Sequence, residues 1–148
     1  MEKDVIISIK GVQRYENADP DTMELVTAGR LEREGNSYTL SYQESELTGL
    51  EGTLTTFQIE PERITLMRVG EFNSQMVFQE GRRHMSMYNT PYGAMTIGVN
   101  TRHLLAELDD QGGEIEIDYA IEIDHSVAGR NTFQINVKEA EGAVSLQA

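Results

Sequence analysis

The stretch "GEIEIDYAIEID", from Gly113 to Asp124, alternates apolar and acidic side chains along almost its whole length. Alternation with a period of two is typical of a β-strand that turns one face to the core and the other to water. The apolar face comprises Ile115, Ile117, Tyr119, Ile121 and Ile123. The stretch therefore predicts a long, half-buried strand and indicates a β-sheet protein.

The same alternation recurs along most of the chain, and no helical periodicity extends beyond about two turns. Turn signals separate the segments, such as Gly35-Asn36 and the "TPYG" motif at Thr90–Gly93, where proline and glycine suit a tight turn. We therefore expect about ten strands. They span approximately residues 5–10, 22–34, 37–44, 53–60, 64–70, 74–80, 84–89, 94–108, 114–124 and 133–138.

Short connections between these segments predict an antiparallel meander, which can hide its edge strands by closing on itself. An even number of strands also lets the first and last pair antiparallel. The predicted fold class is all-β: a closed antiparallel up-and-down β-barrel of about ten strands, calycin- or lipocalin-like. A sandwich of two sheets is the alternative. We expect one domain over residues 1–148, with residues 141–148 as a frayed tail.

Composition narrows the function. The 148 residues include 25 acids and 12 bases, for a net charge of −13, which disfavours binding to nucleic acids and to anionic membranes. Cysteine is absent and three histidines are scattered, so we expect no disulfide, metal or other cofactor. The first residues lack the long apolar run of a signal peptide, so we expect a cytoplasmic protein, as a monomer or a homodimer.

Three stretches resemble the YwiB-like bacterial proteins, a family described as a domain of unknown function. They are "YTLSYQESEL" at 38–47, "ITLMRVGEFNSQMVFQEG" at 64–81 and "MYNTPYGAMTIGVNT" at 87–101. The resemblance covers roughly Val5 to Glu139. It implies a small calycin-like barrel, but it implies no activity and no catalytic residues.

One group of residues could form a site inside such a barrel. If successive strands alternate in direction, the ends of the third, fifth and seventh meet at one rim. Those ends carry Tyr42 and Glu44, Arg68, and Tyr88, and Tyr38 shares a face with Tyr42. Arg68 falls on the apolar face of its strand, so its permanent charge needs a partner. The place of Tyr88 depends on which face of its strand points inward.

This group supports two interpretations. In the first, Arg68 binds the head of a small anionic or amphipathic molecule, the tyrosines orient that molecule, and the apolar barrel holds its tail. In the second, Arg68 and Glu44 form an internal plug, the core is filled, and the acidic face of residues 114–124 meets a protein partner. A third hypothesis is an enzyme in the same cavity, with Glu44 as acid or base and a tyrosine as proton donor.

Overall fold

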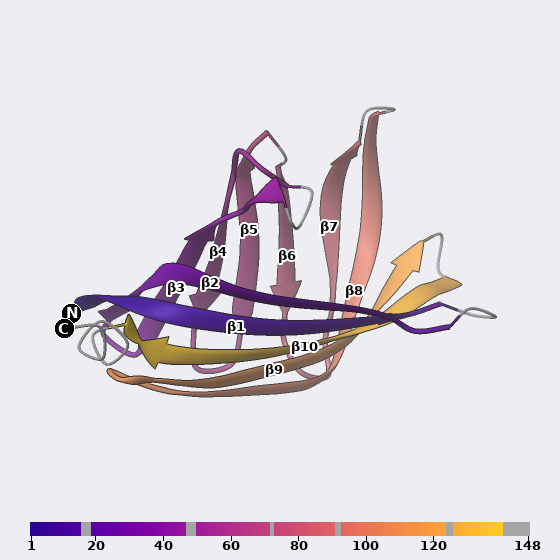
Figure 1. Cartoon of the computed structure of the whole chain (residues 1–148). Coiled ribbons are helices and arrows are strands. Elements are labelled where there is room, and N and C mark those ends of the chain that lie inside the picture. The colour runs from indigo at the N-terminus through magenta and orange to yellow at the C-terminus, as the bar shows by residue number, and fades with distance from the viewer. Residues whose placement is uncertain (16–18, 47–49, 72, 91–92, 124–125, 141–148) are drawn as a thin grey trace.

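Ten antiparallel strands make up the computed structural model (Figure 1), which describes residues 1–15, 19–46, 50–71, 73–90, 93–123 and 126–140, with the backbone alone for 87–90. The residues expected to form a frayed tail, 141–148, lie outside the described residues. The strands are β1 (Glu2–Arg14), β2 (Asp21–Glu34), β3 (Ser37–Gln43), β4 (Thr53–Ile59), β5 (Ile64–Gly70), β6 (Ser74–Phe78), β7 (Arg83–Thr90), β8 (Gly93–Asp109), β9 (Gly112–Ile123) and β10 (Ser126–Glu139).

The strands follow one another around a barrel in sequence order, and β1 pairs with both β2 and β10. Figure 1 shows the shorter strands β3–β6 rising above the long strands β1, β9 and β10. The predicted all-β, antiparallel, ten-stranded meander is confirmed. The first strand pairs with the last, and the even strand count makes this pairing antiparallel.

The barrel is nearly closed, with one open seam between β6 and β7. Within the described chain, Ser74 and Tyr88 are the one residue pair assigned between these two strands. The turn after β6 instead binds to β8: Gly81 N donates to Thr101 O at 2.9 Å, and Thr101 N donates to Arg82 O at 3.2 Å. The strand order is that of the predicted closed barrel, and the correction is confined to this seam, where the β6–β7 turn binds the strand beyond its neighbour.

The inward faces of the strands form a single apolar core, as the alternation predicts. On β9, Ile115 and Ile117 are fully buried and Tyr119 is 3% exposed. The ring of Tyr119 packs against that of Phe78, with centroids 4.7 Å apart, which joins β9 to β6 across the barrel. Burial of each such side chain contributes about 1.5–3 kcal/mol. The most deeply buried large side chains include Ile7, Leu31, Leu40, Phe57, Ile64, Leu66 and Phe78.

Strand β10 begins earlier than its sequence predicts. The expected strand covers residues 133–138, yet the described part of the preceding stretch, from Ser126, already pairs with β9. A register shift between Val127 and Gly129 absorbs the irregular spacing. This extension brings Asn131 into the strand interior, on the same face as Phe133.

A tight turn joins β8 to β9, and Gly113 is required there. Its φ is +145°, and a Cβ atom at this position would lie 1.9 Å from the backbone oxygen of Glu107. Side chains are therefore excluded by both conformation and space. In the described part of the chain, the structure contains no helix long and apolar enough to cross a membrane.

Candidate functional site

A row of paired residues crosses five neighbouring strands near one end of the barrel. Tyr42 of β3 pairs with Thr55 of β4, Thr55 with Arg68 of β5, and Arg68 with Ser74 of β6. Ser74 in turn pairs with Tyr88 of β7. Because paired residues of adjacent strands share a face, this register explains how side chains distant in sequence gather at one level.

Arg68 and Glu44 approach each other inside this row. Arg68 Nε lies 3.9 Å from Glu44 Oε2, and the two side chains are 19% and 1% exposed. The distance is that of an ion pair but is too long for a hydrogen bond. Thr55 Oγ1 donates a short hydrogen bond to the same carboxylate oxygen. Glu44 is therefore held by β4 as well as by the charge of Arg68.

Tyr42 is buried beside this pair, with 6% of its surface exposed. Burial is the main cause that raises the pKa of its phenol, and the negative charge of Glu44 raises it further. The positive charge of Arg68 opposes this shift. The phenol therefore stays protonated well above neutral pH and acts as a hydrogen-bonding group.

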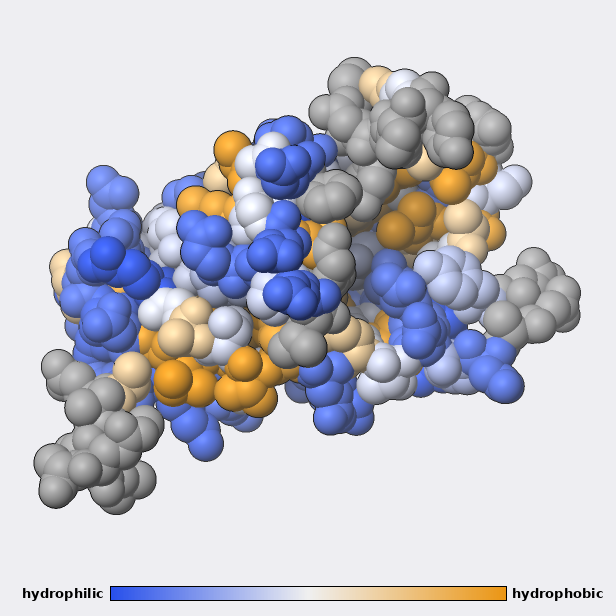
Figure 2. Space-filling model, turned by 45° about the horizontal axis from the view of Figure 1, so that its top comes forward, coloured by the Kyte–Doolittle hydropathy of each residue, from blue (hydrophilic) through white to orange (hydrophobic). Residues whose placement is uncertain are grey.

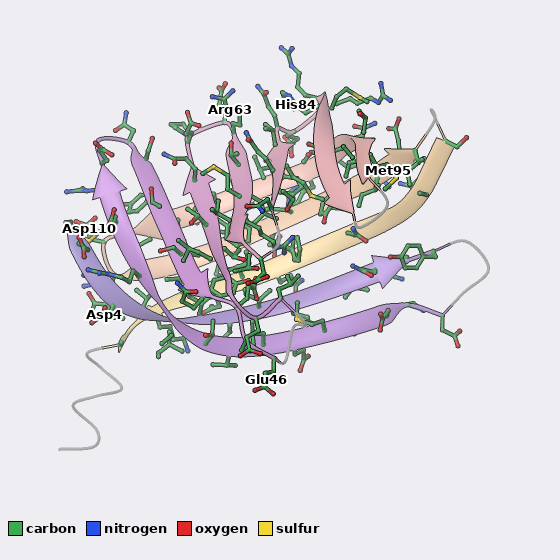
Figure 3. The ribbon with its side chains drawn as sticks, turned by 90° about the horizontal axis from the view of Figure 1, so that it is seen from above. Asp4, Glu46, Arg63, His84, Met95 and Asp110 are labelled. Carbon is green, nitrogen blue, oxygen red and sulfur yellow. The ribbon has the colours of Figure 1, made fainter. Side chains whose placement is uncertain are left out.

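Tyr38 lies at the other end of the barrel. Its hydroxyl donates to Asp110 Oδ1 at 3.4 Å, and Figure 3 shows Asp110 and Met95 at opposite ends of the molecule. Tyr38 lies four positions before Tyr42, which corresponds to roughly 13 Å along a strand. The two tyrosines share a face as expected, but Tyr38 lies apart from the group at Arg68.

Tyr88 is placed by its backbone alone. It pairs with Ser74 on one side and with Met95 on the other, which is the level predicted for the site. Its side chain lies outside the described residues, so the structure brings together Arg68, Glu44 and Tyr42 of the five residues predicted.

Two adjoining hollows open beside Arg68. They have volumes of about 260 and 340 Å³, and both are lined by Arg68, Asn131, Tyr119, Phe133 and Gln13. We call the smaller one the acidic lobe, because Asp21 and Glu44 also line it; its remaining lining residues are Ile9, Gly11, Val12, Met23, Tyr42, Leu50, Phe57 and Thr132. The larger, the apolar lobe, is lined additionally by Tyr15, Leu66, Met76, Met95, Ile97, Ile121, Ile123, Ala128 and Gly129.

The apolar lobe lies at the rim near the β7–β8 hairpin. Figure 2 shows apolar surface there, beside the hairpin and among polar side chains. Met95 is 38% exposed at this rim, whereas Ile97, deeper in the same strand, is 3% exposed. The lobe thus has an accessible entrance and a buried apolar floor.

Two buried polar atoms at the junction of the lobes have no hydrogen-bond partner among the described residues: Arg68 Nε and Asn131 Oδ1. Asn131 is 7% exposed, and its Nδ2 donates to the Tyr119 hydroxyl at 3.2 Å. Buried polar groups are normally satisfied by protein or water, because leaving one unpaired costs about 1–3 kcal/mol. The two residues that carry these atoms, one an unpaired donor and one an unpaired acceptor, line both lobes.

Sequence reasoning missed Asn131 and the role of Tyr119. Asn131 lies two residues before Phe133, so the two share a face if the strand extends that far. A polar residue on this apolar face was the signal that could have identified it. It was overlooked because the expected strand begins only at residue 133. Tyr119 was expected on the apolar face of its strand. Its hydrogen-bond partner could not be predicted, because the β9–β10 register that pairs it with Asn131 is not visible in the sequence.

Apolar and hydrogen-bonding side chains make up most of the described lining of the two lobes. Among the described residues, the lining of both lobes includes no histidine, lysine or cysteine. Over the described residues, no group of three or more histidine, aspartate or glutamate side chains could hold a metal ion. What the site offers is a set of fixed hydrogen-bonding groups next to an apolar hollow.

Comparison with known proteins places this architecture among relatives. The chain is similar to a solved structure, the ywiB protein from Bacillus subtilis, with a TM-score of 0.82 and 20% sequence identity over 93% of this chain and 92% of that one. No curated protein matches the sequence. A family model described as a domain of unknown function, DUF1934, matches residues 7–135. The chain therefore belongs to the DUF1934 family, as the resemblance in its sequence implied.

Proposed function

We propose that this barrel is a binding protein for a small amphipathic or anionic molecule, held with its polar head at Arg68. The observation that carries the proposal is the pair of unpaired buried atoms, Arg68 Nε and Asn131 Oδ1, at the junction of two hollows. A ligand that hydrogen-bonds both atoms removes two desolvation penalties at once.

The architecture supports this use. A strand order that follows the sequence around the barrel, with an apolar hollow at one mouth, is the arrangement by which calycin-like barrels hold one small ligand. Polar groups that fix orientation, set within a mostly apolar wall, are typical of small-molecule sites. A net charge of −13 supports a small molecule over nucleic acid or an anionic membrane as the partner of a cytoplasmic protein.

A structural plug is the second candidate, because Arg68 and Glu44 lie within ion-pair distance. In that case the barrel would serve as a scaffold and its acidic outer face would meet a basic protein. The gap of 3.9 Å and the unpaired Nε favour the ligand pocket, since a plug selected for stability would close the hydrogen bond.

Native mass spectrometry of the purified protein tests the proposal directly. We expect a fraction of the protein to carry a small molecule, and the fraction to fall in an Arg68→Leu variant that still folds. Ser8→Ala, an exposed change on the outer surface of β1, is the control. A wild-type protein that neither carries a molecule nor binds any uncharged or anionic amphiphile added to it would contradict the proposal.

A further inference from the structure

The two lobes differ in charge, and this difference constrains the ligand. Of the described residues that line the apolar lobe, Arg68 is the one that carries a charge. The acidic lobe adds the carboxylates of Asp21 and Glu44, and Glu44 already lies 3.9 Å from Arg68 Nε. The positive charge of Arg68 is thus already balanced by the carboxylate of Glu44 in the protein without a ligand.

An anionic head would meet an unfavourable field at this point. It would lie beside one cation and two carboxylates, in a protein whose net charge is −13. A head with a single full negative charge therefore gains little from Arg68, because Glu44 competes for the same guanidinium. An uncharged head avoids this repulsion and still uses the hydrogen-bonding capacity of the site.

The two unpaired atoms require complementary groups. Arg68 Nε is a donor and needs an acceptor, whereas Asn131 Oδ1 is an acceptor and needs a donor. Asn131 is held in place by its bond to the Tyr119 hydroxyl, and Tyr119 is itself packed on Phe78. A head that carries an acceptor and a donor side by side satisfies both atoms, and a carboxylate or an ester satisfies only the first.

The tail has one favourable direction. From the junction, the apolar lobe leads past Leu66 and Met76 to Ile97, Ile121 and the rim at Met95. These walls would bury the apolar surface of a ligand's tail, which is favourable. The flexible methionine side chains can adapt to tails of different shape. The acidic lobe cannot serve a tail equally well, since Asp21 and Glu44 line it.

We infer that the ligand is an uncharged amphiphile with a carboxamide-like head at Arg68 and Asn131 and an apolar chain in the apolar lobe. This inference rests on the proposed binding function and deepens it. It narrows the ligand from anionic or amphipathic molecules in general to neutral ones whose head offers both an acceptor and a donor.

Competition against an uncharged apolar dye, N-phenyl-1-naphthylamine, tests the inference with four probes of equal chain length. These are octanamide, octanoate, methyl octanoate and octylamine. We expect octanamide to displace the dye at a concentration about fivefold or more below that of methyl octanoate, the factor expected from one buried hydrogen bond. Octanoate and octylamine should displace it more weakly than octanamide.

Variants locate the head and the tail. Asn131→Ala should bring octanamide within about twofold of methyl octanoate, while Asn136→Ala, an asparagine of the same strand outside both lobes, should keep the preference. Met95→Lys should weaken octanamide about fivefold or more, while Met85→Lys, at a methionine 57% exposed outside both lobes, should not.

The outcomes separate this inference from the proposed function. If octanoate displaces the dye at the same concentration as octanamide or below, the head is an anion, so the inference fails while the binding function stands. Equal effects of Met95→Lys and Met85→Lys would likewise overturn the placement of the tail. If neither the dye nor any probe binds, the proposed function fails as well.

Discussion

Arg68 Nε lies 3.9 Å from Glu44 Oε2, which is close enough for an ion pair but too far for a hydrogen bond. Thr55 Oγ1, on the strand between them, binds the same carboxylate oxygen. Glu44 therefore does not depend on Arg68 for its hydrogen bonding. Arg68 Nε has no hydrogen-bond partner among the described residues, which distinguishes this pair from a closed, hydrogen-bonded plug.

A double-mutant cycle measures this relationship. Arg68→Leu, Glu44→Leu and the double variant should give a coupling of about 1 kcal/mol, between the values of exposed pairs and of fully buried ones. The free energies of unfolding come from urea denaturation. A coupling of about 3 kcal/mol or more would identify a structural plug.

Tyr42 predicts a loss of stability at alkaline pH. Burial and the charge of Glu44 raise the pKa of its phenol above the ordinary value of 10.0. A phenol with a higher pKa in the folded than in the unfolded state stabilises the fold below pH 10, and this contribution is lost as the pH rises further. Between pH 10 and 11 the wild type should lose about 1 kcal/mol more than Tyr42→Phe.

Urea titrations at each pH provide this measurement. Tyr15→Phe, at a tyrosine 49% exposed, is the control and should follow the wild type. Equal losses in the wild type and in Tyr42→Phe would show that the phenol of Tyr42 is not protected in the folded protein.

Gly93, which begins β8, should be required for its conformation alone. Its φ is +121°, and a Cβ atom there would meet nothing within 4 Å. Gly93→Val should therefore destabilise the fold by about 1–3 kcal/mol through backbone strain, since β-branched residues rarely adopt positive φ. The melting temperature of the variant checks this prediction. A melting temperature equal to that of the wild type would mean that the "TPYG" turn does not need a positive φ at this position.

Gly113 should be more sensitive than Gly93, because space and conformation both exclude a side chain. Gly113→Ala places a methyl group against the Glu107 backbone oxygen, so we expect a loss of about 3 kcal/mol or more. Gly35→Asn is the matched control: φ is +63°, nothing lies within 4 Å, and asparagine accepts this conformation. Comparable losses in the two variants would contradict the steric argument.

Metal removal should leave the protein unchanged. The chain has no cysteine and three scattered histidines, and the described residues contain no cluster suited to a metal ion. Dialysis against a strong chelator should therefore not alter the melting temperature, measured by scanning calorimetry. A fall of several degrees that is reversed by adding a divalent cation would reveal a metal site.

The candidate site could be predicted from the sequence only in part. Parity placed Arg68 and Glu44 on inward faces at one rim, and the structure brings them together. Tyr38 shares that parity, yet it lies at the opposite end near Asp110. Alternation reports which face a side chain occupies, but it does not report how far along the barrel two side chains lie from each other.

The sequence by itself determined the number of strands and the buried face of most of them. In "GEIEIDYAIEID", as in β5, which spans Ile64–Gly70 as expected, the period of two follows from local backbone geometry and needs no partner. The same local rule indicated ten strands and, through their even number, the pairing of β1 with β10.

Only the tertiary structure decided the seam between β6 and β7, the early start of β10, and the meeting of Asn131 with Tyr119. Each depends on interstrand register, which is set when strands distant in sequence pair and the barrel closes. Register is a property of the assembled sheet, because each strand's alternation is compatible with shifts of two residues that preserve every face. The physical reason is that alternation constrains direction, while position along the barrel comes from packing and backbone hydrogen bonds between strands.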